Sequence, residues 1–432
     1  MTTISRGLAS APKSLMWGFV VGILVSLDVI NIWYIGYSFK LNVLLFFLLG
    51  MLVLLKDYVV KLPRYFFLVA FFVVLSLTSA IHAKELLRGT LYVIYTFIVL
   101  YLSVVVVYTL SRKNPEKFFQ GYIYSLVIQI FIAALLVLLG IHDRAQFLYY
   151  EPSYFALALT PLFAFLSLNI INGNILKVST FIYVLSVFIF FFFSKSANGL
   201  LILFLSFFTV SFLIFFSSGF KGKRHVILSI SAITFLGFFI AVPVLVYLRG
   251  YGGDDLLLTS LQKVIFSSDK LDFLVDRVGN RLNRILLAID VFKDNIFVGV
   301  GPGNYVNYIE NIEHELYDVP AWLNPYGRPA INMYIEVAAA TGVLGLFAFL
   351  LILGSVVFGS VSGLRFSAEY LVIFAAIIVF LVAINFESSY LRLYFWAWVG
   401  MLFSLRRKVV KNKPTPDSVR SKERTELLLR HG

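Results

Sequence analysis

The chain has 432 residues, of which 60% are hydrophobic and only 14% are charged. Soluble domains contain about 45–50% apolar and about 25% charged residues, so this composition excludes an ordinary soluble domain and indicates a membrane protein. The sequence has no cysteine, which excludes disulfides, thiolate nucleophiles and Cys-ligated metals, and its five scattered histidines give no zinc-ligand spacing.

The net charge of +13 is concentrated at the end of the chain, where nine of the basic residues follow Leu405. This tail begins Arg406-Arg407-Lys408 and is typical of a cytoplasmic segment that meets anionic lipid. We therefore expect no nucleic-acid partner. The first 13 residues show no small-residue cleavage site after a short apolar core, so the first span is expected to be retained.

Apolar runs long enough for a transmembrane helix, about 20 residues, recur along most of the chain. They predict an all-α polytopic membrane protein with about twelve spans. The spans are expected at 14–36, 41–55, 63–82, 88–110, 118–141, 154–171, 178–194, 199–217, 225–248, 332–358, 367–386 and 390–405. Trp17, Trp33, Trp396 and Trp398 lie near the ends of spans, where interface aromatics are expected.

The positive-inside rule orients these spans. With both termini in the cytoplasm, the short cytoplasmic loops carry 11 Lys and Arg residues and the short loops on the other side carry 6. This orientation places residues 249–331, the one large polar segment, in the periplasm of a Gram-negative cell. The chain is thus expected to divide into spans 1–248, an outer loop 249–331, spans 332–405 and a basic tail 406–432.

Cations on the outer face are candidates for binding an anionic substrate, because the positive-inside bias disfavours them there. Arg88 opens a span, Arg144 lies in a short loop, Lys195 lies in the turn between two spans and Arg328 lies just before a span. The alternative is that these side chains only snorkel to the interface or stabilise turns and helix ends. Arginine suits phosphate through its bidentate fork.

Glu151 lies at the mouth of a span, in the run Glu151-Pro-Ser-Tyr154. One interpretation is a carboxylate that favours a helix N-terminus. The other is a group that orients or deprotonates a sugar hydroxyl at the outer membrane surface. The tyrosines beside it suit contact with sugar faces.

The outer segment contains a predicted helix over 271–293, since its apolar residues recur at helical spacing. Arg277, Arg281 and Arg284 share one face of this helix, and three cations on one face indicate an anionic partner such as a lipid-linked diphosphate. The run Gly299-Val-Gly-Pro-Gly303 then ends the helix. It lacks the Lys-Ser/Thr ending of a P-loop, so it is not a nucleotide-binding loop of that type. Gly301 and Gly303 remain candidates for anion contact because an anion can approach a backbone N–H that no side chain covers. A second stretch, 305–316, is also expected to be helical.

Asn332 and Glu336 open the next predicted span, followed by the small-residue run Ala338-Ala-Ala-Thr-Gly342. Small residues let helices approach closely, which explains the run by packing alone. A carboxylate one turn inside a span is costly unless it is paired, so Glu336 is expected to face an outer arginine.

Three stretches together resemble the O-antigen polymerase and O-antigen ligase superfamily. They are Arg284 to Tyr305, which reads RILLAIDVFKDNIFVGVGPGNY; Asn332 to Gly345, which reads NMYIEVAAATGVLG; and Glu151 to Leu159, which reads EPSYFALAL. The number of spans and the late outer loop also agree. The sequence departs from the family at Ile331, where ligases carry a histidine that is thought to act at the acceptor.

The resemblance implies a membrane-embedded glycosyltransferase of the C type that needs no metal or other cofactor. Its substrates would be polyprenyl-diphosphate-linked glycans, and a chain-length regulator is a possible partner. Polymerisation of repeat units of O-antigen, capsule or exopolysaccharide is favoured over ligation by Ile331. Arg284, together with Arg281, Arg88 and Arg144, would neutralise the diphosphate leaving group. Glu151 would orient or deprotonate the acceptor hydroxyl. A flippase for lipid-linked sugars is the alternative of another class, but it would carry charged residues deep in several spans.

Overall fold

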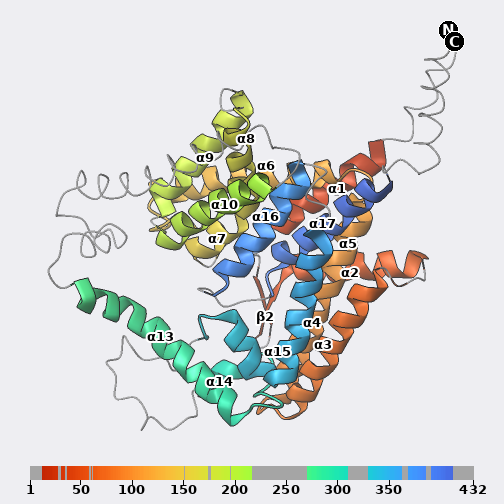
Figure 1. Ribbon diagram of the computed structural model, residues 1–432, viewed down its shortest axis with the longest axis vertical. Helices are drawn as coiled ribbons and strands as arrows, with labels where there is room; N and C mark the ends of the chain where they lie inside the picture. Colours follow the sequence, from red (N-terminus) through yellow and green to blue (C-terminus); the bar gives the residue numbers. More distant parts are fainter. Residues whose placement is uncertain are drawn as a thin grey trace.

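The computed structural model describes most of the chain as packed helices (Figure 1). The described residues are 12–27, 31–34, 37–57, 60, 62–149, 151–173, 177–194, 196–216, 270–309, 329–361, 368–385 and 391–411. Five described helices are long and apolar enough to cross a membrane, and a bent pair makes a sixth. The chain is therefore a helical, polytopic membrane protein. The count of twelve spans and the periplasmic place of 249–331 stay predictions, and the predicted span 225–248 lies outside the described residues.

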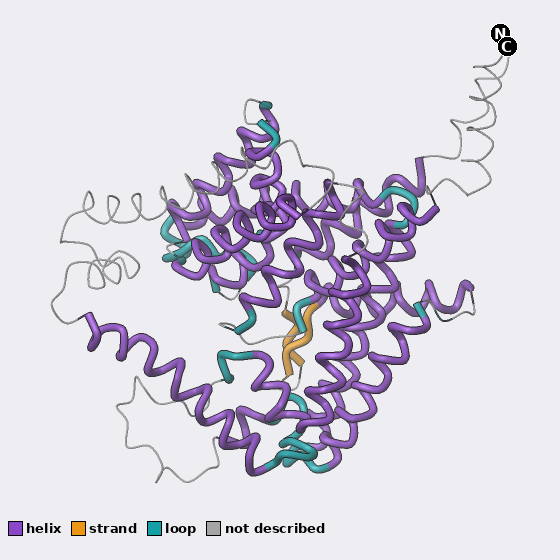
Figure 2. Tube along the Cα trace, viewed as in Figure 1, coloured by secondary structure: helices purple, strands orange, loops and turns teal. Residues whose placement is uncertain are grey.

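The first predicted span is wrong in its second half. Helix α1 (Pro12–Ser26) is followed by an antiparallel hairpin of β1 (Asn31–Tyr34) and β2 (Tyr37–Lys40). The expectation of an all-α chain is corrected accordingly, and Figure 2 shows the two strands surrounded by helices. The strands are rich in aromatic residues, which favour strands.

The end of α1 is stabilised inside the protein rather than by water. The carbonyl of Ser26 accepts hydrogen bonds from the Tyr149 hydroxyl (2.8 Å) and from Nε2 of Gln129 (3.3 Å). The Ser26 hydroxyl donates to Ser125 Oγ at 2.7 Å. Because a free carbonyl is costly in an apolar setting, these partners allow the helix to stop at Ser26 while the sequence is still apolar.

The next helices follow the predicted spans closely. They are α2 (Leu41–Asp57), α3 (Pro63–Ile81), and α4 (Leu86–Phe97) continued by a π-helical turn (Ile98–Leu102) into α5 (Ser103–Ser111). A π turn displaces carbonyls from their regular donors. Here the hydroxyl of Tyr65 on α3 donates to the carbonyl of Leu100 at 2.8 Å, which joins the two helices at this irregularity.

A second group of helices consists of α6 (Pro115–Leu138), α7 (Pro152–Ala158), α8 (Thr160–Ile171), α9 (Val178–Ser194) and α10 (Ala197–Phe216). The predicted span 154–171 is bent by 53° between α7 and α8. Pro161 has no N–H to give to the carbonyl of Leu157, and the hydroxyl of Thr160 donates to that carbonyl instead, at 2.6 Å.

The predicted helix 271–293 is confirmed as α13 (Lys270–Asp294), and α14 (Tyr305–Ile309) forms the described part of the predicted helix 305–316. Helix α15 (Met333–Ser360) consists of two helical segments joined by a kink at Gly342. Helices α16 (Ala368–Ala383) and α17 (Leu393–Lys411) complete the fold. Figure 1 shows α13 and α14 beside α15 at the lower end of the bundle, away from α6 to α10.

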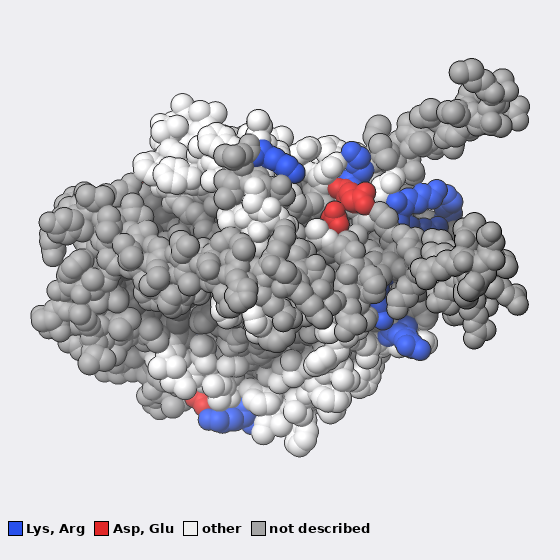
Figure 3. Space-filling view, turned by 45° about the horizontal axis from the view of Figure 1, so that its top comes forward, with Lys and Arg blue, Asp and Glu red and all other residues white. Residues whose placement is uncertain are grey.

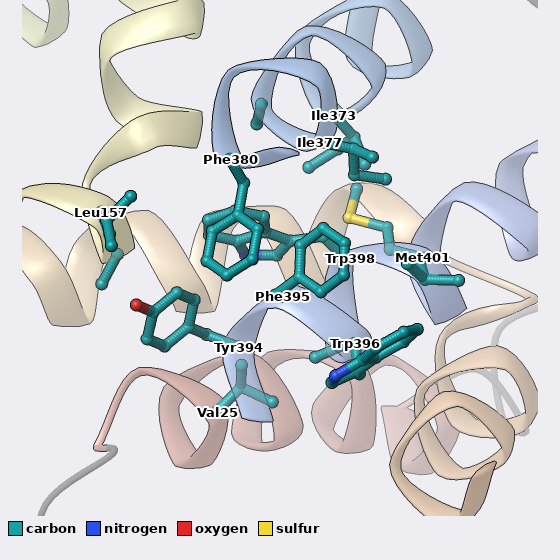
Figure 4. Close-up of a cluster of buried hydrophobic side chains, with 14 of the residues drawn as sticks. Val25, Leu157, Ile373, Ile377, Phe380, Tyr394, Phe395, Trp396, Trp398 and Met401 are labelled. Atoms are coloured by element: carbon teal, nitrogen blue, oxygen red, sulfur yellow. The ribbon is translucent and has the colours of Figure 1, made fainter. Parts of the chain in front are cut away.

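Aromatic side chains of α16 and α17 form the centre of the core (Figure 4). The rings of Phe380 and Phe395 stack with centroids 4.1 Å apart, and Trp398 meets Phe380 edge-on. Trp396 and Trp398 are both 0% exposed, so they pack inside the protein and do not face lipid headgroups; their depth in the membrane stays a prediction. Lipid tails are as apolar as these rings, so close packing rather than transfer from water stabilises the cluster.

Charged side chains are few on the described surface that Figure 3 presents. The view brings the top of Figure 1 forward, and Lys, Arg, Asp and Glu form separate small groups between uncharged regions. Large apolar side chains are exposed on several helices, including Phe67 and Phe71 on α3 and Phe347 on α15. Such exposure is expected of helices that face lipid.

Candidate functional site

The glycine-rich run after α13 locks this helix against the kink in α15. The amides of Val300 and Gly301 donate to the carbonyls of Ala339 and Ala340, each at 2.9 Å. In return the amide of Val343 donates to the carbonyl of Ile296 at 2.7 Å. The break at Gly342 interrupts the helical ladder, and the loop supplies the missing partners. The result is a fixed joint between α13 and α15.

The candidate anion contacts Gly301 and Gly303 have a packing role in this joint. Both have positive φ angles, 92° and 72°. A Cβ atom at Gly301 would lie 2.4 Å from the Cβ of Ala83, and one at Gly303 would lie 2.3 Å from the ring of Tyr92. The backbone N–H of Gly301 already donates to the carbonyl oxygen of Ala340, so it is not free for an anion. Substrate contact by either glycine stays a prediction.

Arg284, Tyr305 and Glu336 come together from α13, α14 and α15. Tyr305 is buried, and its hydroxyl has no hydrogen-bond partner among the described residues. Burial raises the pKa of this phenol well above its ordinary value; the Glu336 carboxylate raises it further and the Arg284 guanidinium lowers it. Glu336 and Arg284 are therefore each within electrostatic reach of Tyr305. We call them the Arg284 cluster.

Glu336 adds a buried acceptor to this cluster. Its Oε2 atom is cut off from solvent and has no hydrogen-bond partner among the described residues. A buried carboxylate oxygen without a hydrogen-bond partner is costly to maintain. The position therefore suits a site that receives polar groups from a ligand, and a pairing of Glu336 with an outer arginine stays a prediction.

Arg88 lies in a second network, at the start of α4. Its guanidinium donates to Oδ1 of Asn307 at 2.7 Å, and the amide of Asn307 donates to Oε1 of Glu85, also at 2.7 Å. The Glu85 amide donates to Oδ1 of Asn304 at 3.3 Å. Arg88 thus helps to hold α14 against α4, and a contact with substrate stays a prediction.

Asn332 caps α15. Its Oδ1 accepts from the amides of Tyr334 (3.0 Å) and Ile335 (3.2 Å), and its Nδ2 donates to Oδ1 of Asn385 at 3.2 Å. The cap satisfies two amides that a helix start leaves free. It also joins the first turn of α15, which carries Glu336, to the end of α16.

Glu151 lies immediately before α7, and its side chain makes no capping hydrogen bond to the helix. Its exposed carboxylate accepts from the hydroxyl of Ser153 at 3.2 Å. Next to it, the guanidinium of Arg392 lies 3.7 Å from the ring centroid of Tyr154, a cation–π contact. Arg392 is buried. The start of α7 thus carries the Glu151–Ser153 hydrogen bond and the contact of Tyr154 with Arg392, which precedes α17.

Sequence reasoning did not select Tyr305 or Arg392 as site residues. Tyr305 follows directly on the glycine-rich run, and Arg392 precedes a continuous aromatic run, which are the signals that point to them. Arg144 is half-buried in the turn after α6. The next residue, Ala145, donates its backbone N–H to the carbonyl oxygen of Phe193 on α9 at 3.0 Å. Lys195 and Arg328 lie outside the described residues, and the side chain of Arg281 does too. The described residues hold no group of three or more His, Asp or Glu placed to bind a metal ion.

A sequence model of the O-antigen ligase family matches residues 178–350. The matched range runs from α9 into α15 and contains the whole Arg284 cluster. The match confirms the resemblance to the O-antigen polymerase and ligase superfamily. No curated protein sequence matches the chain.

Proposed function

The chain carries an O-antigen ligase-type domain over residues 178–350, and from this we propose that it is a glycosyltransferase acting on polyprenyl-diphosphate-linked glycans. The reaction we propose is polymerisation of the repeat units of a surface polysaccharide (O-antigen, capsule or exopolysaccharide). The observation that carries the proposal is the Arg284 cluster, which combines a guanidinium with two buried, unpartnered oxygens inside the matched range.

In the proposed reaction, a hydroxyl oxygen of the acceptor repeat unit bonds to the anomeric carbon of the donor. The bond from that carbon to the diphosphate breaks, and polyprenyl diphosphate leaves with the electron pair. Arg284 neutralises the departing charge through its bidentate fork, with Arg281 beside it on α13. Arg88, Arg144, Arg328 and Lys195 are further candidates for binding the anionic substrate.

The acceptor hydroxyl must lose its proton during this step. We propose Glu151 as the group that orients this hydroxyl or takes its proton, since its carboxylate is exposed at the mouth of a span. Glu336 has another role in the proposal, which is to hold Arg284 in place. Asn332 fixes the turn that carries Glu336, and Gly301 and Gly303 allow the close approach of α13 to its neighbours.

The proposed setting is the inner membrane of a Gram-negative cell. In the proposed orientation, both termini lie in the cytoplasm and the segment 249–331 lies in the periplasm. This agrees with the outer leaflet as the place where enzymes of this superfamily join lipid-linked repeat units. A chain-length regulator is a candidate partner. This orientation rests on the distribution of Lys and Arg between the loops.

Ligation of finished polymer to a lipid or protein acceptor is the second candidate. It is supported by the description of the matching family, O-antigen ligase. Ile331 stands where ligases of the superfamily carry a histidine, and this is why polymerisation is proposed first.

A strain that lacks the gene tests these functions on a gel of its surface polysaccharide. Polymerisation predicts core with a single repeat unit and no ladder. Loss of all attached polysaccharide, with long lipid-linked polymer accumulating, would identify a ligase. Single units that accumulate on the cytoplasmic leaflet would identify a flippase and overturn the proposal.

Variants in the same strain test the role of Arg284. Arg284→Ala is expected to lower polymer yield at least about a hundredfold, because it removes a charged hydrogen-bond donor to the leaving group. Arg284→Lys keeps the charge without the fork and is expected to restore only part of the yield. The control is Lys293→Ala, on the same helix, whose lysine makes an exposed ion pair with Asp290. Wild-type yield from Arg284→Ala, at equal protein abundance in the membrane, would exclude the proposed role.

A further inference from the structure

A pocket of about 480 Å³ lies between the turn after α3 and the loop after α13. It is lined by His82 and Lys84 from the turn, by Asp294 and Asn295 at the end of α13, and by Tyr308 of α14, with backbone from the glycine-rich run. None of the residues of the Arg284 cluster lines it. Its volume is in the range of about 300–1,000 Å³ that is usual for small-molecule sites.

Two opposite charges of this pocket have no ion-pair partner among the described residues. Lys84 and Asp294 both line it and both are exposed, yet they do not pair with each other or with a described neighbour. Asp294 also lies in the last turn of α13, the end of a helix where a carboxylate is unfavourable. The nearby Lys293 is already paired with Asp290 at 2.9 Å. Helix stability therefore does not explain the carboxylate.

The surroundings of the pocket are apolar and exposed. Phe297, in the pocket wall, is 76% exposed, and Ile296 beside it is also exposed. Ile81 ends α3 next to the pocket, and Val343 and Leu344 begin the long segment of α15 there. Contiguous exposed apolar groups of this kind mark contact with lipid.

Helix α3 ends at the pocket, while α15 passes it at the kink near Gly342. Both helices are long and apolar enough to cross a membrane, and they pack side by side through Phe72 and Phe349, whose ring centroids are 5.6 Å apart. The end of α3 beside the pocket is where we place the lipid headgroups. A lysine and a carboxylate at one pocket can form ion pairs with the phosphate and the ammonium of a zwitterionic headgroup.

We propose that this pocket binds the headgroup of a zwitterionic phospholipid with a primary ammonium, a phosphoethanolamine, while the acyl chains lie on the exposed faces of α3 and α15. Lys84 pairs with the phosphate and Asp294 with the ammonium. The Nδ1–H of His82 is held by the carbonyl of Thr78 at 2.9 Å, which fixes the imidazole at the pocket wall. This inference does not depend on the glycosyltransferase activity.

Native mass spectrometry of the full-length protein tests the proposal, with phosphatidylethanolamine and phosphatidylglycerol of identical acyl chains in equal amounts. Wild type is expected to retain phosphatidylethanolamine over phosphatidylglycerol by about fivefold, as partly exposed ion pairs allow. Asp294→Asn should bind both lipids equally, since only the ammonium loses its partner. Lys84→Ala should lose both lipids by a similar factor. Lys293→Ala is the matched control and should behave as wild type.

A second measurement uses the wild-type protein alone, so that it does not depend on the folding of a variant. Phosphatidylcholine has the same phosphate and keeps the positive charge, but its quaternary ammonium donates no hydrogen bond, so it should bind more weakly than phosphatidylethanolamine and more tightly than phosphatidylglycerol. Equal binding of all three lipids to wild type would overturn the proposal. The proposal would also be overturned if Asp294→Asn kept the wild-type preference for phosphatidylethanolamine over phosphatidylglycerol. Displacement of the lipid by a soluble repeat-unit oligosaccharide would overturn it too, and would identify a sugar site.

Discussion

Single side chains decide what the Arg284 cluster can do. Arg284, Tyr305 and Glu336 are separated by up to 52 positions in the chain, and only the joint between the glycine-rich run and α15 brings them together. The cluster leaves a phenol hydroxyl and a carboxylate oxygen without partners among the described residues. Such groups lower stability, and their presence is typical of a binding site.

Tyr305→Phe separates stability from function at this cluster. Removing an unpartnered buried hydroxyl should leave the unfolding temperature unchanged or raise it, because the desolvation cost of that group, about 1–3 kcal/mol, disappears. Polymer yield should fall about tenfold if the hydroxyl donates to a charged substrate oxygen, since such bonds contribute about 1.5–3 kcal/mol. The unfolding temperature of the purified protein and the polysaccharide ladder are the two measurements.

Tyr370→Phe is the matched comparison. The hydroxyl of Tyr370 donates to the carbonyl of Ser360 at 2.8 Å, so its loss should lower the free energy of unfolding by about 1 kcal/mol and leave the yield unchanged. A Tyr305→Phe protein that is destabilised in the same way, with normal yield, would show that the hydroxyl serves the fold and not the substrate.

At the scale of elements, the kink in α15 has a physical cause that can be tested. Gly342 has φ 69° and ψ −175°, a region open only to glycine. A Cβ atom there would lie 2.3 Å from the carbonyl oxygen of Phe297. Gly342→Ala should therefore destabilise the protein by about 3 kcal/mol or more and abolish polymer formation, because it separates α13 from α15.

The control for this prediction lies in the same helix. Gly354 has only the ring of Phe358 near it, at 3.8 Å, so Gly354→Ala should stabilise α15 by about 0.5–1 kcal/mol. Thermal unfolding in detergent gives both values. Equal stability of the two variants would mean that the kink is not required for the joint.

The sequence predicted helices well where their signals are local. Pro63, Pro115 and Pro152 each stand at the first position of a helix, and the apolar runs after them gave α3 and α6 to within a few residues. The hairpin at 31–40 was missed because an apolar run reads equally as helix or strand. The burial of Trp396 and Trp398 was missed because hydropathy does not distinguish lipid from protein as the surrounding medium.

The candidate site was predictable only in part, for a related reason. Arg284 was found because three arginines repeat at helical spacing, which is a local pattern. The electrostatic effect of Glu336 on Tyr305 and the stacking of Arg392 on Tyr154 join residues that are distant in the sequence, so no spacing rule indicates them. Asn332 was selected as a substrate-binding candidate; the structure shows that it caps α15, and contact with substrate stays a prediction.

At the scale of the whole molecule, the orientation in the membrane is open to a direct test because the chain has no cysteine. Lys293→Cys, at an exposed position on α13, should react with a membrane-impermeant maleimide in intact spheroplasts. Lys113→Cys, in the turn between α5 and α6, should react only after permeabilisation. The cysteine-free wild type is the background control, and the reverse labelling pattern would invert the proposed topology.

The hairpin of β1 and β2 has a consequence for where water reaches. A sheet of two strands leaves one edge of each strand with backbone N–H and C=O groups that no other described strand takes up. Hydrocarbon cannot satisfy such edges, so lipid-exposed open sheets do not occur within a bilayer. In the view of Figure 2, this hairpin lies above the lower ends of α3 and α15. The free edges of the hairpin must therefore meet water or other protein groups and not hydrocarbon, so the helices around it have to keep lipid away from the strands.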